Sequence, residues 1–134
     1  MTNETIENLI KSAFRVLEHA YVPYSHFKVG AALLTSDGEI YTGCNIENGA
    51  FTPTNCAERT AFFKAISEGK RDFTCIVVVN EREDGLHDYC PPCGVCRQVM
   101  SEFCKPDFTI ILAKSETDYK TYTLDDLLPL RFEL

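Results

Sequence analysis

No stretch of this 134-residue chain approaches the ~20 consecutive apolar residues of a membrane-spanning helix. The N-terminal segment carries Glu4 and Glu7 where a secretory signal would carry basic residues, so we expect a cytoplasmic protein. Basic residues are scarce and form no cluster: 13 Lys and Arg stand against 20 Asp and Glu, for a formal net charge of -7. This balance argues against nucleic acid or an anionic membrane as a partner and favours a small neutral ligand.

Cysteine, in contrast, is abundant, with seven residues in the chain. The odd number excludes a complete set of intramolecular disulfides, and a cytoplasmic location favours free thiols. Clustered cysteines in such a protein indicate metal binding or catalysis, whereas scattered ones are usually small buried hydrophobic residues. Cys90, Cys93 and Cys96 form a cluster. Three others lie inside apolar segments, where we expect core positions: Cys44, Cys75 and Cys104.

The alternation of helical and extended patterns predicts a single α/β domain over residues 1–134, without repeats or linkers. Apolar residues at three- and four-residue spacing predict a first helix that starts after Thr2 or Asn3 and ends before Pro23. Three further helices are expected, over 56–68 with Gly69 as C-cap, over 93–104, and briefly from Thr123. Five segments are typical of strands: 27–35, 40–44, 73–79, 108–113 and 119–123. These elements predict a three-layer α/β/α sandwich with a mixed five-stranded sheet.

The spacing of Cys93 and Cys96 places two sulfurs about one helical turn apart, which suits a single metal ion. Zinc takes four ligands, yet there is no second such pair, and no ligand spacing among the histidines His19, His26 and His87. The best third candidate is Cys56, which opens a predicted helix directly before the acid Glu58. Three protein ligands leave one position for water, as in a catalytic site for one Zn²⁺ per chain.

The negative charge of three thiolate ligands must be balanced by nearby positive groups. Three thiolates and Zn²⁺ leave a formal charge of about -1, which weakens the ion as a Lewis acid. The N-termini of the two predicted helices favour thiolates, and we infer that Arg59 donates hydrogen bonds to the sulfurs from the second layer of the site. Both effects keep the ion electrophilic.

Other interpretations of the same residues stay open at this point. The paired cysteines also suit a redox dithiol or a purely structural zinc site. Asn55 and Glu58 fit a capping box, in which Glu58 only fixes the start of a helix. Cys90 and Cys93 form a second, overlapping pair with the same spacing, so Cys90 is an alternative ligand.

Cys56-Ala57-Glu58 followed by Pro92-Cys93-Gly94-Val95-Cys96 resembles the zinc nucleobase-deaminase motif in its all-cysteine form. Further segments are similar to small homotetrameric cytidine deaminases: 24–33, 43–48, 55–61 and 96–99. This resemblance implies a zinc-dependent hydrolase that deaminates free cytidine and 2′-deoxycytidine to the uridine forms in pyrimidine salvage, with release of ammonia. Cys56, Cys93 and Cys96 would hold the zinc. Glu58 would move a proton from water to ring N3 and a second one to the leaving ammonia.

The resemblance also implies how the substrate is bound. Asn45 and Glu47 correspond to the pair that binds the ribose hydroxyls, and Phe27 to an aromatic ring that stacks on the pyrimidine. The backbone of Ala57 would read the base edge. Phe132 resembles a C-terminal aromatic residue that closes the site of a neighbouring subunit, so the sites would lie at the interfaces of a homotetramer.

Two departures and three rival functions accompany this resemblance. Phe51 stands where many relatives have tyrosine, and the tail after Pro129 is short, which weakens the role expected of Phe132. Blasticidin-S deaminases share the zinc motif but generally lack the Asn-Ile-Glu ribose pair, so the pair favours cytidine. An editing deaminase would need a basic channel for polynucleotide, which the net charge opposes. A zinc-stapled binding module without catalysis is the third rival.

Overall fold

Five strands form one mixed sheet in the order β2-β1-β3-β4-β5 in the computed structural model, which describes all residues from 1 to 134. The strands are β1 (Lys28–Thr35), β2 (Ile40–Cys44), β3 (Phe73–Glu81), β4 (Thr109–Ala113) and β5 (Tyr119–Thr123). β3 and β4 run parallel, whereas the other neighbouring pairs are antiparallel. No helix is both long enough and apolar enough to cross a membrane.

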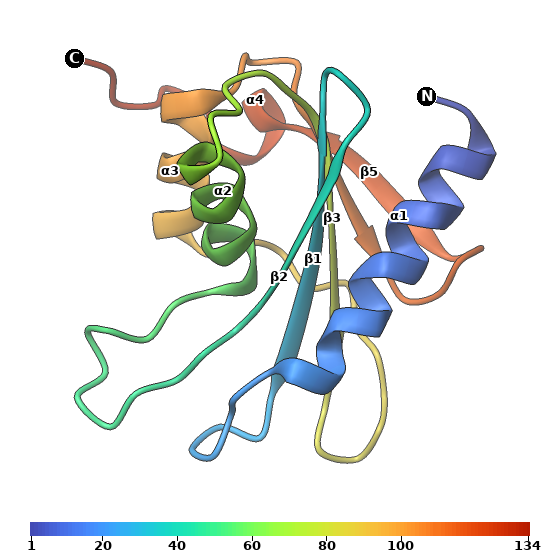
Figure 1. Ribbon diagram of the computed structural model, residues 1–134, viewed down its shortest axis with the longest axis vertical. Coiled ribbons are helices and arrows are strands. Elements are labelled where there is room, and N and C mark those ends of the chain that lie inside the picture. Colours follow the sequence, from blue (N-terminus) through green and yellow to red (C-terminus); the bar gives the residue numbers. More distant parts are fainter.

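Helices cover both faces of this sheet (Figure 1). α1 (Asn3–Val16) lies across one face, and α2 (Ala57–Ser67), α3 (Gly94–Phe103) and α4 (Leu124–Leu127) lie on the other. Each face has its own buried cluster: Ile76 and Val78 of β3 belong to the cluster under α2, whereas Val77 and Val79 belong to the one under α1. The predicted three-layer sandwich with a mixed five-stranded sheet is confirmed.

α1 begins as predicted, with Thr2 as its N-cap, but it ends earlier than its apolar periodicity suggests. A short 3-10 turn, Leu17–His19, follows Val16. Tyr21 then leaves the helical path and pairs with the segment after β2: its N–H donates to the carbonyl of Asn45 at 3.0 Å, and its carbonyl accepts from the N–H of Glu47 at 2.9 Å. The backbone of the 45–47 segment takes the bonds that a longer helix would have kept to itself.

α2 sits unusually close to β2 because Gly43 has no side chain. A Cβ at this position would lie 2.4 Å from the carbonyl oxygen of Ala57 and 2.5 Å from the N–H nitrogen of Ala61. The other end of α2 closes at Gly69, whose φ of +96° suits the left-handed turn after the cap residue Glu68. The first turn of α2 is therefore fixed to the sheet edge at β2, and the predicted stop at Gly69 agrees with the structure.

Candidate functional site

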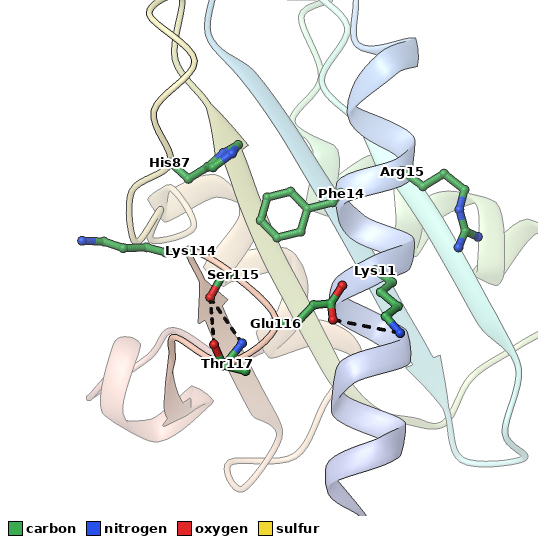
Figure 2. A pocket seen from close by; sticks show the side chains of 8 residues that line it. All are labelled: Lys11, Phe14, Arg15, His87, Lys114, Ser115, Glu116 and Thr117. Carbon is green, nitrogen blue, oxygen red and sulfur yellow. Dashed lines mark hydrogen bonds and ion pairs between the residues drawn. The ribbon is translucent and has the colours of Figure 1, made fainter.

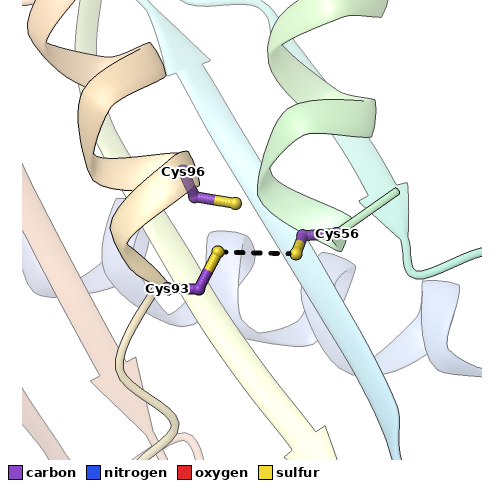
Figure 3. A group of neighbouring side chains, drawn as sticks. All are labelled: Cys56, Cys93 and Cys96. Atoms are coloured by element: carbon purple, nitrogen blue, oxygen red, sulfur yellow. Dashed lines mark hydrogen bonds between the residues drawn. The ribbon is translucent and has the colours of Figure 1, made fainter. Parts of the chain in front are cut away.

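The first turns of α2 and α3 meet and bring together the three cysteines predicted as metal ligands (Figure 3). Cys56 is the N-cap residue of α2, Cys93 is the N-cap residue of α3, and Cys96 follows in the first turn of α3. Their sulfurs all lie within 4.8 Å of one another, and those of Cys56 and Cys93 are 3.7 Å apart. Tetrahedral zinc with Zn–S bonds of ~2.3 Å places two sulfurs about 3.8 Å apart. The donor set and its spacing fit a zinc ion.

Arg59 stabilises negative charge on the Cys56 sulfur. Its Nη2 donates to the Cys56 sulfur at 3.3 Å, as the sequence predicts. Hydrogen bonds from Cys96, Arg59 and Cys93 outweigh burial and lower the pKa of Cys56 to about 5. The pKa of Cys96 is raised, because Cys96 donates to the Cys56 sulfur and is itself buried. One thiolate at Cys56 thus anchors the cluster, and a divalent cation is the species that would let all three ionise.

Cys90, the alternative ligand, stands apart from this cluster. Its sulfur is not within the group that holds Cys56, Cys93 and Cys96 together. Burial raises the pKa of the Cys90 thiol to about 12, so it stays neutral. The grouping of the sulfurs therefore favours Cys93 with Cys96 over Cys90 with Cys93.

Glu58 lies in the first turn of α2 and is only 4% exposed. Burial raises the pKa of its carboxyl to about 7, against the opposing effect of its backbone hydrogen bond. The capping-box interpretation is wrong, because the N-cap residue is Cys56 rather than Asn55, and no side-chain capping hydrogen bond is present at this helix start. Asn55, the other member of the expected box, instead donates to the hydroxyl of Thr60 at 3.0 Å. The buried carboxyl of Glu58 therefore has no capping role in the helix.

A cavity of about 200 Å³ connects Glu58 to the cysteines and to the segment after β2. Its lining residues are Val29, Asn45, Glu47, Thr54, Asn55, Cys56, Ala57, Glu58, Cys90, Pro91 and Cys93. Four of these lining residues are not among the predicted site residues: Val29, Thr54, Asn55 and Pro91. The signal for Thr54 and Asn55 lies in the turn-rich 45–55 loop, which folds back on itself through two backbone bonds of 3.0 and 2.9 Å between Ile46 and Asn55.

Asn45 and Glu47 line the cavity and also hold its wall in place. The Asn45 amide accepts from the N–H of Val29 at 2.9 Å and donates to the carbonyl of Phe27 at 2.8 Å. Oε1 of Glu47 accepts from the N–H groups of Tyr24 and Ser25 at 3.0 and 3.1 Å, and the bonds with Ser25 lower the pKa of the carboxyl. These hydrogen bonds fix the 45–47 segment to residues 24–29, which lead into β1.

The two predicted aromatic contacts lie outside the cavity of the single chain. Phe27 is half-buried and is not a lining residue. Phe132 is 67% exposed, and its carbonyl accepts from Nε2 of Gln98 at 3.3 Å. Phe51, the departure from the family pattern, is 76% exposed. The geometry of one chain therefore assembles the cysteines, Glu58, Ala57, Asn45 and Glu47, but neither Phe27 nor Phe132.

A second cavity, of about 790 Å³, opens between α1 and the turn that joins β4 to β5 (Figure 2). None of the predicted site residues lines it. Two of its lysines already interact with other side chains. Lys11 pairs with Glu116 at 4.0 Å, and the Nζ of Lys114 lies 4.5 Å from the centre of the Tyr89 ring. Figure 2 shows Lys114 and Arg15 directed to opposite sides. The smaller cavity beside the cysteines is therefore the candidate site.

Comparison with known proteins agrees with this geometry. Residues 3–112 match a family model described as the cytidine and deoxycytidylate deaminase zinc-binding region. A cytidine deaminase of Sporosarcina psychrophila is 51% identical over 124 residues, which cover 92% of this chain and 88% of that protein. A blasticidin-S deaminase of Bacillus cereus is 33% identical over 128 residues, which cover 92% of this chain and 89% of that protein.

The fold agrees as well. The crystal structure of a cytidine deaminase from Burkholderia pseudomallei aligns with a TM-score of 0.86 at 45% identity, over 98% of this chain and 100% of that one. The resemblance seen in the cysteine motifs is confirmed by the family match, the sequence relatives and the solved structure. This chain belongs to the cytidine and deoxycytidylate deaminase family.

Proposed function

We propose that residues 1–134 form one catalytic domain that converts free cytidine and 2′-deoxycytidine to uridine and 2′-deoxyuridine, with release of ammonia. The observation that carries this proposal is the buried carboxyl of Glu58 in the same small cavity as Cys56 and Cys93. An acid in this cavity lies close both to an ion held by the cysteines and to a substrate bound beside it. The family to which the chain belongs supplies the substrate class, and the assignment of individual residues is our proposal.

Cys56, Cys93 and Cys96 are the residues that would hold one Zn²⁺ per subunit. When bound, the ion supplies the Lewis acidity that lets water act as a nucleophile at neutral pH. Arg59 donates to the Cys56 sulfur and draws charge away from the ligands, which preserves that acidity. These four side chains set the electrostatics of the site and do not themselves exchange protons with the substrate.

Glu58 is the residue that moves protons. Its carboxylate takes a proton from the attacking water and delivers it to N3 of the cytosine ring, while the oxygen of that water bonds to C4. The carboxyl then transfers the second proton of the water to the amino group, and the C4–N bond breaks as ammonia leaves. Water and cytidine are thus converted to uridine and ammonia, and Glu58 returns to its starting state. Its burial keeps bulk water away from both transfers.

The remaining lining residues are proposed to bind the nucleoside. Glu47 uses Oε1 for the backbone of Tyr24 and Ser25, so Oε2 is the atom proposed for a ribose hydroxyl, with Asn45 beside it. The backbone of Ala57, at the start of α2, is proposed to read the base edge. Phe27 is proposed to stack on the pyrimidine, and Phe132 to close the site of a neighbouring chain in a homotetramer.

This function fits pyrimidine salvage in the cytoplasm. The odd number of cysteines, seven, excludes a complete set of intramolecular disulfides and supports a reducing compartment. The net charge of -7 suits a neutral nucleoside and opposes polynucleotide as the substrate.

Glu58→Gln tests the proposal against a purely structural zinc site. We expect the variant to keep its fold and one zinc per chain, measured by circular dichroism and metal analysis, while ammonia release from cytidine falls below detection. Glu47→Gln is the matched control, because it makes the same chemical change in the same cavity. That control should keep turnover and raise KM for nucleosides more than for free cytosine. Deamination at the wild-type rate by Glu58→Gln contradicts the proposal.

A second candidate is deamination of blasticidin S, favoured by the relative from Bacillus cereus. The Asn45-Ile46-Glu47 segment at the cavity favours a ribose and therefore cytidine. Comparison of kcat/KM for cytidine and blasticidin S decides between them, and a higher value for the antibiotic would reverse the assignment.

A further inference from the structure

Arg97 holds the backbone around Cys93 from two directions. Its Nε donates to the carbonyl of Pro92 at 2.7 Å, in the peptide group immediately before Cys93. Its backbone N–H donates to the carbonyl of Cys93 at 3.0 Å, in the peptide group immediately after. The second bond is the first backbone bond of α3, which any residue at this position makes, so the bond from Nε to Pro92 is the one that the arginine side chain adds beside Cys93.

The same guanidinium reaches a distant part of the chain. Its Nη1 donates to the carbonyl of Leu127, at the end of α4, at 2.6 Å. α4 is itself fixed, because Thr123 and Asp126 form a capping box at its start and Leu124 is fully buried. The planar guanidinium of arginine bridges two acceptors in a set geometry, which a lysine ammonium cannot do. Arg97 thus braces the turn at Pro92 against α4.

Cys93 needs such support more than its neighbours do. It is exposed, follows two prolines, and begins α3 without a hydrogen bond from a capping side chain. The equivalent position of the other helix has a similar brace: the hydroxyl and the N–H of Thr60 donate to the carbonyl of Cys56 at 3.2 and 3.0 Å. In both helices the side chain of the residue four positions after the first cysteine donates to the carbonyl of a peptide group that flanks that cysteine's Cα: Thr60 to that of Cys56 and Arg97 to that of Pro92.

We propose that Arg97 is a positioning residue for the metal, which keeps the sulfur of Cys93 at the distance from Cys56 and Cys96 that one zinc ion requires. This inference rests on the zinc site proposed above. The bonds of Arg97 go to backbone carbonyls, so its removal leaves every ligand in place and loosens only one of them. Zinc should then leave the protein faster, although the fold and the other two ligands persist.

The test measures zinc release from the purified holoenzyme to an excess of a chromogenic chelator. Arg97→Gln should release zinc at least about tenfold faster than the wild type, as expected for loss of an outer partner of a ligand. Arg97→Lys should lie between the two, because a lysine keeps the charge but bonds at a single point. Melting temperatures by circular dichroism report on the fold in parallel.

Arg71→Gln is the matched control. The Nη1 of Arg71 also donates to two backbone carbonyls, those of Ile66 and Lys70, both at 2.8 Å, at the C-terminal end of α2, which is opposite to the end that carries Cys56. This variant should release zinc at the wild-type rate. Equal release from Arg97→Gln and the wild type overturns the inference, as does failure of both Arg97 variants to fold while Arg71→Gln folds. A wild-type protein that binds no zinc would overturn the zinc site together with it.

Discussion

Arg59 lies beside the cysteine cluster although its guanidinium makes few hydrogen bonds there. Its Nη2 donates to the Cys56 sulfur, yet its Nε is the one buried side-chain nitrogen or oxygen without a partner. An unpaired buried donor costs roughly 1–3 kcal/mol. The pKa of Cys56 is lowered, so its sulfur is the negative charge beside this guanidinium, and that attraction opposes the cost. Arg59 therefore belongs to the electrostatics of the cysteine cluster, as its position next to Glu58 predicts.

Arg59→Ala should lower kcat or zinc affinity by about 10–100-fold, since it removes the cation that faces the thiolates. KM for cytidine should change far less, because Arg59 does not line the cavity. Steady-state kinetics and zinc titration measure the three quantities, with Arg59→Lys recovering part of the loss. Wild-type kcat and zinc affinity in Arg59→Ala would show that the residue is an ordinary helix charge.

Individual residues differ in how far the sequence predicts them. The spacing of Cys93 and Cys96 places their sulfurs within reach of one ion, because a helical turn converts sequence distance into sulfur distance. The pair Cys90 and Cys93 has the same spacing, so the choice between the two pairs needs the structure. The side chains of Asn45 and Glu47 accept from the N–H groups of Val29 and Tyr24, which lie 16 and 23 positions away, so these bonds depend on how two distant segments meet. Local spacing carries no information about such bonds, which is why the structural part of both roles was missed.

At the scale of whole elements, two glycines set how closely helices approach the sheet. Gly43 on β2 faces α2, where a Cβ would lie 2.4 Å from the carbonyl oxygen of Ala57. Gly30 on β1 faces α1, where a Cβ would lie 2.3 Å from the carbonyl oxygen of Ala13. Both contacts involve backbone, which cannot rotate away. The first one lies beside Glu58 and Cys56, whereas the second lies on the opposite face of the sheet.

Gly43→Ala should displace the first turn of α2 and destabilise the fold by about 1–3 kcal/mol, as overpacking generally does. Because this turn carries Glu58 and follows Cys56, zinc content and kcat should fall as well. Gly30→Ala should show a similar loss in denaturant unfolding but keep zinc content and kcat. If both variants lose zinc to the same extent, the spacing between β2 and α2 has no special role in the site.

The elements themselves follow closely from sequence, with one instructive exception. α2, α3 and the five strands lie within a few residues of the predicted ranges, since their apolar patterns are bounded by glycine, proline or polar turns. α1 ends before Pro23, as predicted, but the helical apolar spacing continues to Tyr21 whereas the α-helix itself ends at Val16. The backbone bonds of Tyr21 to the 45–47 segment prevail over the helical pattern.

At the scale of the whole molecule, the cavity of one chain is small and two aromatic rings near the predicted interface are exposed. The cavity of about 200 Å³ is below the range of roughly 300–1,000 Å³ that is usual for small-molecule pockets. Phe51 and Phe132, at 76% and 67% exposed, are large apolar side chains without cover in a single chain. No periodicity or motif spacing describes what another copy contributes, so the homotetramer stays a prediction from family membership. Its expected mass is four times the 15.1 kDa of the chain, measured by light scattering.

Phe132→Ala tests whether that assembly completes the site. Zinc content and oligomeric mass should stay unchanged, while KM for cytidine should rise about tenfold as one aromatic contact is lost. Mixed oligomers of Phe132→Ala and Glu58→Gln chains make the test specific. A site with an intact Glu58 then meets an intact Phe132 from its neighbour, so part of the activity should regain the wild-type KM. If the mixture shows only the KM of Phe132→Ala, the ring of Phe132 does not contribute to the site of an adjacent subunit. In that case the chains with an intact Glu58 gain nothing from neighbours that keep Phe132.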